Sequence, residues 1–165
     1  MDELLPLVDE CGIVIGSVLR SICHDGSKPL HPVVHLHVLN EKGEILLQKR
    51  SMNKDLQPGK WDTSVGGHVD FGEKIEETLI REAREELGIK EMKPIFLRSY
   101  LFESDIEKEM VYSYQTLYEG IFEFNTEEID EIRFWSWAEI KENLGKSVFT
   151  PNFEMEFQWL STNNR

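Results

Sequence analysis

The stretch from Gly67 to Ile89 reads GHVDFGEKIEETLIREAREELGI and decides the expected fold and site. It begins as a Gly-rich turn and continues as a helix that Gly88 ends. Placed at about 100° per residue, the apolar side chains of the helix share one arc of roughly 140°. This arc predicts a buried helix face made of Leu79, Ile80, Ala83 and Leu87.

Three glutamates of this helix lie where charges are unusual. With Ile75 taken as zero, Glu82 falls at about −20° and Glu86 at about +20°, on or beside the apolar arc, and Glu85 falls near −80°. Like charges three or four residues apart destabilise a helix, and carboxylates are unfavourable near its negative C-terminal end. The cluster therefore predicts a bound cation. Hard oxygen ligands favour Mg²⁺ or Mn²⁺, with substrate phosphates as further ligands.

The spacing of these residues resembles the Nudix box, G-x5-E-x7-R-E-U-x-E-E-x-G-U, in which U is a bulky or aliphatic residue. The matching positions are Gly67, Glu73, Arg81, Glu82, Glu85, Glu86, Gly88 and Ile89, and only Ala83 is smaller than the pattern asks. The resemblance implies an α/β/α sandwich with a mixed sheet, formed by residues 1–165 as a single domain. It also implies metal binding by the Gly67 carbonyl and the glutamates Glu82, Glu85 and Glu86, with Glu73 and Arg81 in support.

Composition narrows the class of protein. A chain of 165 residues has the size of one domain. Its net charge of −13 argues against binding to nucleic acid or to an anionic membrane, so a phosphate-bearing substrate would need metal ions as its positive partner. The acidic N-terminus does not read as a signal peptide, no apolar run is long enough to span a membrane, and two cysteines, Cys11 and Cys23, fit a reducing cytoplasm. Monomer and homodimer both stay open.

Hydrophobic patterning predicts the elements around the box. An N-terminal hairpin is expected over residues 7–19, and a polar loop over 23–32 carries His24 and His31. Further strands are expected at 33–39, 45–49, 63–65, 95–102, 110–122 and 132–135, and C-terminal helices at 138–143 and 152–160. Strands on both sides of one long helix, with more helices at the end, indicate an α/β layered domain.

The segment from His24 to His68 is similar to one branch of the family, the isopentenyl-diphosphate isomerases and their hydrolase-like relatives. The shared residues are His24-x6-His31, Leu47-Gln48-Lys49-Arg50, Lys54, Pro58-Gly59-x-Trp61 and Gly67-His68. The resemblance implies a second site for Zn²⁺ or Mn²⁺, made of His24, His31, His68, Glu107 and Glu109. It also makes Arg50 and Lys54 candidates for contact with substrate phosphates, although both are equally typical of solvated surface cations.

Two departures from the isomerases favour hydrolysis. The isomerases carry a cysteine immediately before the box glycine, where this chain has Gly66, which cannot supply the acid that protonates an alkene. They also have a basic residue at the position of Glu82. The sequence thus predicts a Mg²⁺-dependent pyrophosphohydrolase of a nucleoside diphosphate derivative, with Glu82, Glu85 and Glu86 as catalytic residues. The alternatives are an isopentenyl-diphosphate isomerase and a non-catalytic nucleotide-binding sensor.

Overall fold

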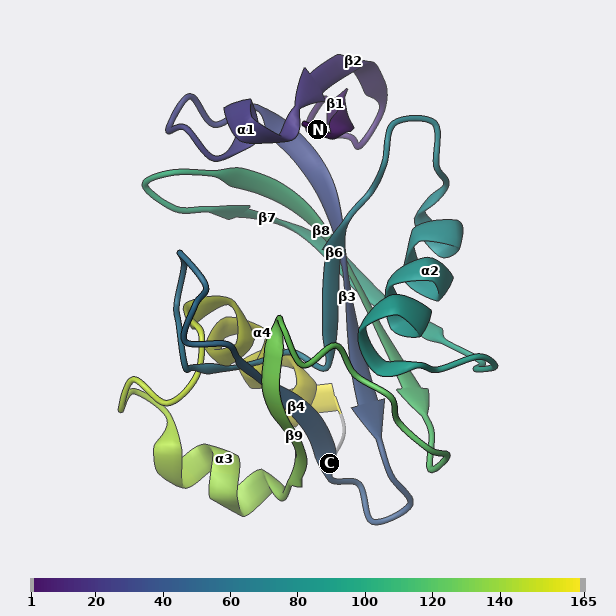
Figure 1. Ribbon diagram of the computed structural model, residues 1–165, viewed down its shortest axis with the longest axis vertical. Coiled ribbons are helices and arrows are strands. Elements are labelled where there is room, and N and C mark those ends of the chain that lie inside the picture. The colour runs from purple at the N-terminus through teal and green to yellow at the C-terminus, as the bar shows by residue number, and fades with distance from the viewer. Residues whose placement is uncertain (1, 164–165) are drawn as a thin grey trace.

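The computed structural model describes residues 2–163 as one layered α/β unit (Figure 1). Its strands are β1 Leu4–Val8, β2 Val14–Leu19, β3 Leu30–Leu39, β4 Ile45–Arg50, β5 Trp61–Asp62, β6 Val65–His68, β7 Ile95–Glu103, β8 Lys108–Leu117 and β9 Ile129–Trp135. Its helices are α1 Arg20–Cys23, α2 Ile75–Leu87, α3 Trp137–Asn143 and α4 Pro151–Asn163. The box helix ends where its sequence predicts, because Gly88 terminates it in the left-handed conformation.

A seven-stranded mixed sheet forms the middle layer, and β3 lies at its centre. β3 runs parallel to β8 along its whole length, whereas it pairs antiparallel with β6 and, at one residue pair, with β4. Strands β4 and β6 thus pair with β3 at different places along its length. The hydroxyl of Ser64 links β3 to β4, because it accepts from the Val38 amide and donates to the Leu46 carbonyl.

The two faces of β3 differ in character because successive side chains of a strand point to opposite sides. Val34, Leu36 and Val38 face α2 and pack in a core with Leu79, Ala83 and Leu87. The other face carries His31, His35 and His37. A second core, built on Phe149, Phe153 and Phe157, packs helices α3 and α4 against strands β4 and β9. Figure 1 shows α2 on one side of the sheet and α4 on the other, so the expected α/β/α sandwich with a mixed sheet is confirmed.

Some expectations on single elements were wrong. Ile80 is 49% exposed, and Thr78 is buried in its place, so the buried arc extends from about −60° to about +120° and contains Glu82 and Glu86 near its middle. His31 belongs to β3, which begins at Leu30, and not to a loop. The strand expected over residues 110–122 runs instead over Lys108–Leu117, and it therefore also takes in Glu109.

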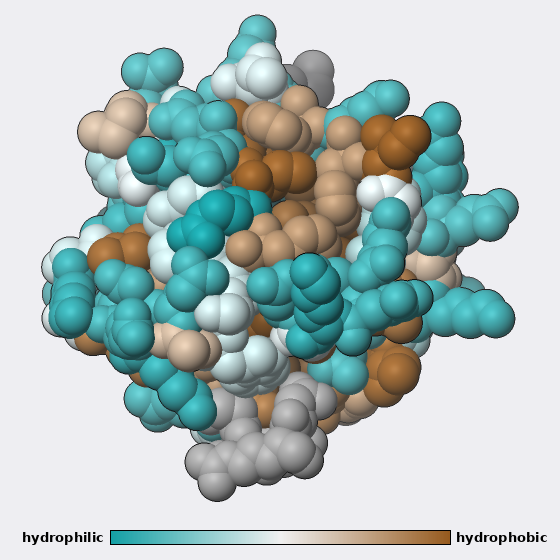
Figure 2. Space-filling view, turned by 90° about the horizontal axis from the view of Figure 1, so that it is seen from below, coloured by the Kyte–Doolittle hydropathy of each residue, from teal (hydrophilic) through white to brown (hydrophobic). Residues whose placement is uncertain are grey.

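The surface agrees with the acidic composition. Figure 2 shows one face on which hydrophilic side chains surround a narrow apolar strip. No helix among the described residues has the length and hydrophobicity needed to cross a bilayer.

Candidate active site and metal centres

The turn before α2 is fixed to the helix by Arg81. Its guanidinium donates to both oxygens of Glu73, at 2.8 and 2.9 Å, and to the carbonyl of His68 at 3.1 Å. It also donates to Glu82 at 2.8 Å and to Glu85 at 3.2 Å. The hydrogen bonds from Arg81 lower the pKa of Glu73 to about 2, so this carboxylate is charged at neutral pH. The geometry fits the supporting roles expected for Glu73 and Arg81.

Glu82 and Glu86 lie side by side on the sheet-facing side of α2. Glu86 accepts a hydrogen bond from Gln48 at 2.8 Å, and its other oxygen is buried without a hydrogen-bond partner among the described residues. Burial, and then the charge of Glu82, raises the pKa of Glu86 well above its usual value. Burial also raises the pKa of Glu82, although Arg81 opposes this. A cation between the two carboxylates would remove the cost of holding them together.

Gly67 lies directly against this pair. A Cβ atom at position 67 would come within 2.2 Å of the Glu82 carboxyl carbon, so only glycine leaves the carboxylate in place. Glu85, with 58% of its side chain exposed, extends from the same helix towards solvent. The chain thus gathers the four expected ligands of the first metal site, Gly67, Glu82, Glu85 and Glu86, around one turn and one helix.

A cavity of about 1050 Å³ opens over these residues. Arg50, at the end of β4, and Lys54, in the loop that follows, line it, as do His24, Glu107 and Glu109. Arg50 donates to Asp62 at 3.2 Å, and the ammonium of Lys54 lies 3.8 Å from Glu128. Both cations are therefore on the cavity wall, yet each already faces a carboxylate.

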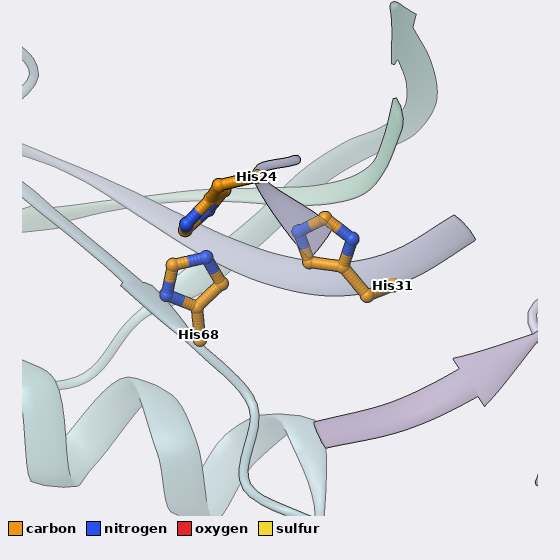
Figure 3. Close-up of side chains that lie close together, drawn as sticks. All are labelled: His24, His31 and His68. Carbon is orange, nitrogen blue, oxygen red and sulfur yellow. The ribbon is translucent and has the colours of Figure 1, made fainter. Parts of the chain in front are cut away.

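Three histidines converge beside the cavity from separate segments, and Figure 3 shows their rings together. His24 follows α1, His31 lies in β3, and His68 ends β6. Their ring centroids are 5.3 to 6.2 Å apart, and one nitrogen from each ring lies within 4.8 Å of the others. Glu107 contacts His24 at 3.2 Å, and Glu109 pairs in register with His31, their side chains 3.9 Å apart. All five expected ligands of the second site are thus brought together.

The donor set fits a transition metal. His31 bonds through Nδ1 to the Pro29 carbonyl at 2.9 Å, which leaves Nε2 for a ligand, and Nε2 of both His31 and His68 is buried without a hydrogen-bond partner among the described residues. Burial lowers the pKa of His31, and lowers that of His68 to about 3, so both imidazoles are neutral. Burial, and then the charge of Glu107, raises the pKa of Glu109 to about 8. A bound cation would favour its ionised form.

A second group of polar residues at the site was not expected from the sequence. His35 and His37, on the same face of β3 as His31, both contact the buried carboxylate of Glu156 in α4. His35, Gln48 and Asp62 also line the cavity. The signal for the histidines is the spacing His31-x3-His35-x-His37, which places all three on one face of a strand. No local signal connects them to Glu156, which is 119 residues beyond His37.

Comparison with known proteins identifies the family. The model of the NUDIX domain matches residues 29–153, which is most of the chain. The chain belongs to the Nudix family. It is 29% identical over 156 residues to the isopentenyl-diphosphate Delta-isomerase of Salmonella heidelberg, a match that spans 91% of this chain and 84% of the isomerase. The expected resemblance to that branch is therefore confirmed at the level of distant homology.

Solved Nudix structures share the fold. DR0079 from Deinococcus radiodurans is 26% identical with a TM-score of 0.82, over 94% of this chain and 98% of DR0079. The MutT protein of Methanosarcina mazei is 30% identical with a TM-score of 0.69, over 84% and 98% of the two chains. The Nudix chain described here is thus similar both to an isomerase and to a MutT protein, and its own residues must distinguish between the two chemistries.

Proposed function

We propose that this Nudix protein is a Mg²⁺-dependent pyrophosphohydrolase that cleaves a diphosphate linkage, with a nucleoside diphosphate joined to another group as the substrate. The observation that carries the proposal is the adjacent pair Glu82 and Glu86, whose pKa values are raised; one buried oxygen of Glu86 has no hydrogen-bond partner within residues 2–163. Holding two buried carboxylates next to each other destabilises the folded protein unless a cation binds them. Their position on the wall of the cavity gives a phosphate group access to that cation.

Each residue of the box has a proposed role. When bound, Mg²⁺ supplies charge neutralisation of the phosphates and lowers the pKa of a water molecule. Glu85, Glu86 and the carbonyl of Gly67 act as ligands, and Glu82 acts as a ligand or as the general base. Arg81 holds the Glu82 carboxylate and is itself held by Glu73, so the pair orients the metal-binding group. Arg50 and Lys54, which line the same cavity, contact the substrate phosphates.

A second metal ion is part of the proposal. Within the described part of the chain, buried nitrogens of His31 and His68 have no hydrogen-bond partner, and both rings are neutral; these observations support binding of Zn²⁺ or Mn²⁺ together with His24, Glu107 and Glu109. His24, His68, Glu107 and Glu109 line the same cavity as the box glutamates. The second metal site therefore has access to the same substrate.

Two other functions remain as alternatives. The homology to an isopentenyl-diphosphate isomerase favours isomerisation, but Gly66 supplies no acid for that reaction. A non-catalytic nucleotide sensor would use the same cavity without turnover. The intact set of Glu82, Glu85 and Glu86 argues against it, because binding alone does not require a complete cation site.

Screening a substrate panel tests the proposal. Purified protein is incubated with nucleoside di- and triphosphates, dinucleotides and isoprenoid diphosphates, with Mg²⁺ or Mn²⁺, and products are separated by chromatography. We expect Mg²⁺-dependent hydrolysis of a nucleoside diphosphate derivative, and no hydrolysis by Glu86→Gln protein purified in parallel. Isomer interconversion would support the isomerase instead, and tight nucleotide binding without turnover would support the sensor.

A further inference from the structure

Glu156 is a fixed buried anion behind the cavity. Its side chain is 2% exposed, and it accepts hydrogen bonds from four groups. Ser113 donates at 2.5 Å, Tyr100 at 2.7 Å and His37 at 3.0 Å, and the fourth donor is Nδ1 of His35. The four donors come from three strands, and the carboxylate that they hold comes from α4. A carboxylate held in this way cannot turn, so the ring of His35 is oriented by the fold itself.

The opposite edge of the His35 ring faces the cavity. His35 lines the cavity, and 11% of its side chain is exposed. A Cβ atom on Gly66 would lie 3.4 Å from Cδ2 of His35 and 3.8 Å from its Nε2. Glycine at position 66 therefore leaves this edge of the imidazole uncovered, and the contact with Glu156 is made by Nδ1 on the other edge.

A protonated His35 has the opposite charge to the carboxylates that line the cavity with it. These are Asp62, Glu86 and Glu109, and each would repel a substrate phosphate in the absence of metal. Burial alone would lower the pKa of His35, but the charge of Glu156 and its hydrogen bond outweigh burial and raise the pKa to about 9. The ring thus presents an N–H donor on each edge, one to Glu156 and one to the cavity.

We propose that Nε2 of His35 donates a hydrogen bond to a phosphate oxygen of the substrate, and that Glu156 is the positioning residue that holds the ring for this contact. The inference rests on the proposed diphosphate hydrolysis and adds a specific protein donor to it. His37 provides the internal comparison. It contacts the same Glu156 from the same face of β3, but it is fully buried and does not line the cavity.

Two substitutions at position 35 separate the two edges of the ring. His35→Asn keeps an amide nitrogen near the position of Nδ1 and removes the donor on the cavity side, whereas His35→Gln places an amide nitrogen near the position of Nε2. His37→Gln is the matched control, because His37 contacts Glu156 through Nε2 and glutamine places an amide nitrogen near that position. The probe is Mg²⁺ with methylenediphosphonate, a diphosphate that cannot be hydrolysed, and its Kd is measured by titration calorimetry. The kcat and KM of the best substrate of the panel are measured in parallel.

We expect His35→Asn to weaken methylenediphosphonate binding and to lower kcat/KM by about tenfold or more, the usual scale for a hydrogen bond to a charged group. His35→Gln should recover part of the loss, and His37→Gln, which keeps a donor towards Glu156, should stay within threefold of the wild type. Glu156→Gln should lower kcat/KM in the wild type but add little in the His35→Asn background, since it acts through the same contact.

Several results would overturn this inference. Equal losses in His35→Asn and His37→Gln would mean that both histidines only maintain the fold, as would fully additive effects of Glu156→Gln and His35→Asn. An unchanged His35→Asn, in a protein whose wild type binds the probe and hydrolyses a diphosphate, would reject the His35 contact alone. A wild type that neither binds the probe nor hydrolyses any diphosphate would reject the proposed function, and the His35 contact with it.

Discussion

Gly67→Ala tests whether the position of the Glu82 carboxylate matters for turnover. The added Cβ would lie 2.2 Å from the Glu82 carboxyl carbon, and ordinary contact begins at 3.4 Å, so the carboxylate must move by about 1.2 Å. Mg²⁺ requires near-ideal octahedral geometry, and a misplacement of about 1 Å at a reacting centre can lower the rate by about 10²-fold. We therefore expect kcat to fall on that scale, measured as product release at saturating Mg²⁺.

The control for a general effect of the methyl group is Gly16→Ala in β2. There the new Cβ would meet only Leu7 at 3.7 Å, far from the cavity, and kcat should not change. Glu82→Gln gives the complementary result, because it removes the charge without a steric clash and should also lower kcat while the protein stays folded. Near-wild-type turnover in both Gly67→Ala and Glu82→Gln would refute the role of Glu82 in the site.

Three further predictions concern the other groups of the site. Isopentenyl diphosphate should not be converted to dimethylallyl diphosphate above background, as followed by product analysis, and interconversion abolished by Glu86→Gln would contradict this. Metal analysis after supplementation with Zn²⁺ or Mn²⁺ should find one bound transition metal. Its affinity should fall as the pH decreases from 8 to 6, because Glu109 gains a proton. A protein without a bound ion would reject the second site formed by His24, His31, His68, Glu107 and Glu109. The pKa of His35 is raised from 6.5 to about 9, so its stabilising contribution is complete below pH 6.5 and is lost as the pH rises through 9. Denaturant unfolding should show this loss in the wild type, and an equal loss in His35→Asn would contradict it.

The box could be predicted because its signals are local. The turn, the helix period and Gly88 all lie within 23 residues, and the grouping of Glu82 with Glu86 follows from helix geometry alone. At the two edges of the apolar arc, helix geometry alone did not predict which side chains are buried. Thr78 is buried because its hydroxyl binds Glu73 and the Lys74 carbonyl, and Ile80 consequently faces solvent.

The contact between His35 and Glu156 could not be predicted from the sequence. The two residues are 121 positions apart, and only the packing of α4 against β3 brings them together. A buried glutamate in a C-terminal helix has no local pattern that distinguishes it from a solvated one. The convergence of His24, His31 and His68 could be expected only from the family resemblance, since three separate segments contribute the rings.

Glu86→Gln tests the central claim, that this helix binds Mg²⁺ for hydrolysis, most directly. Changes to groups that merely support metal ligands cost about 10–100-fold, so the loss of a ligand charge should lower kcat by about 100-fold or more at saturating Mg²⁺. Thermal unfolding gives the second readout. Because burial and the charge of Glu82 raise the pKa of Glu86, the neutral amide should raise the Tm of the metal-free protein, while the stabilisation of the wild type by Mg²⁺ should be lost. Wild-type turnover together with an unchanged Mg²⁺-induced shift of Tm would contradict the account.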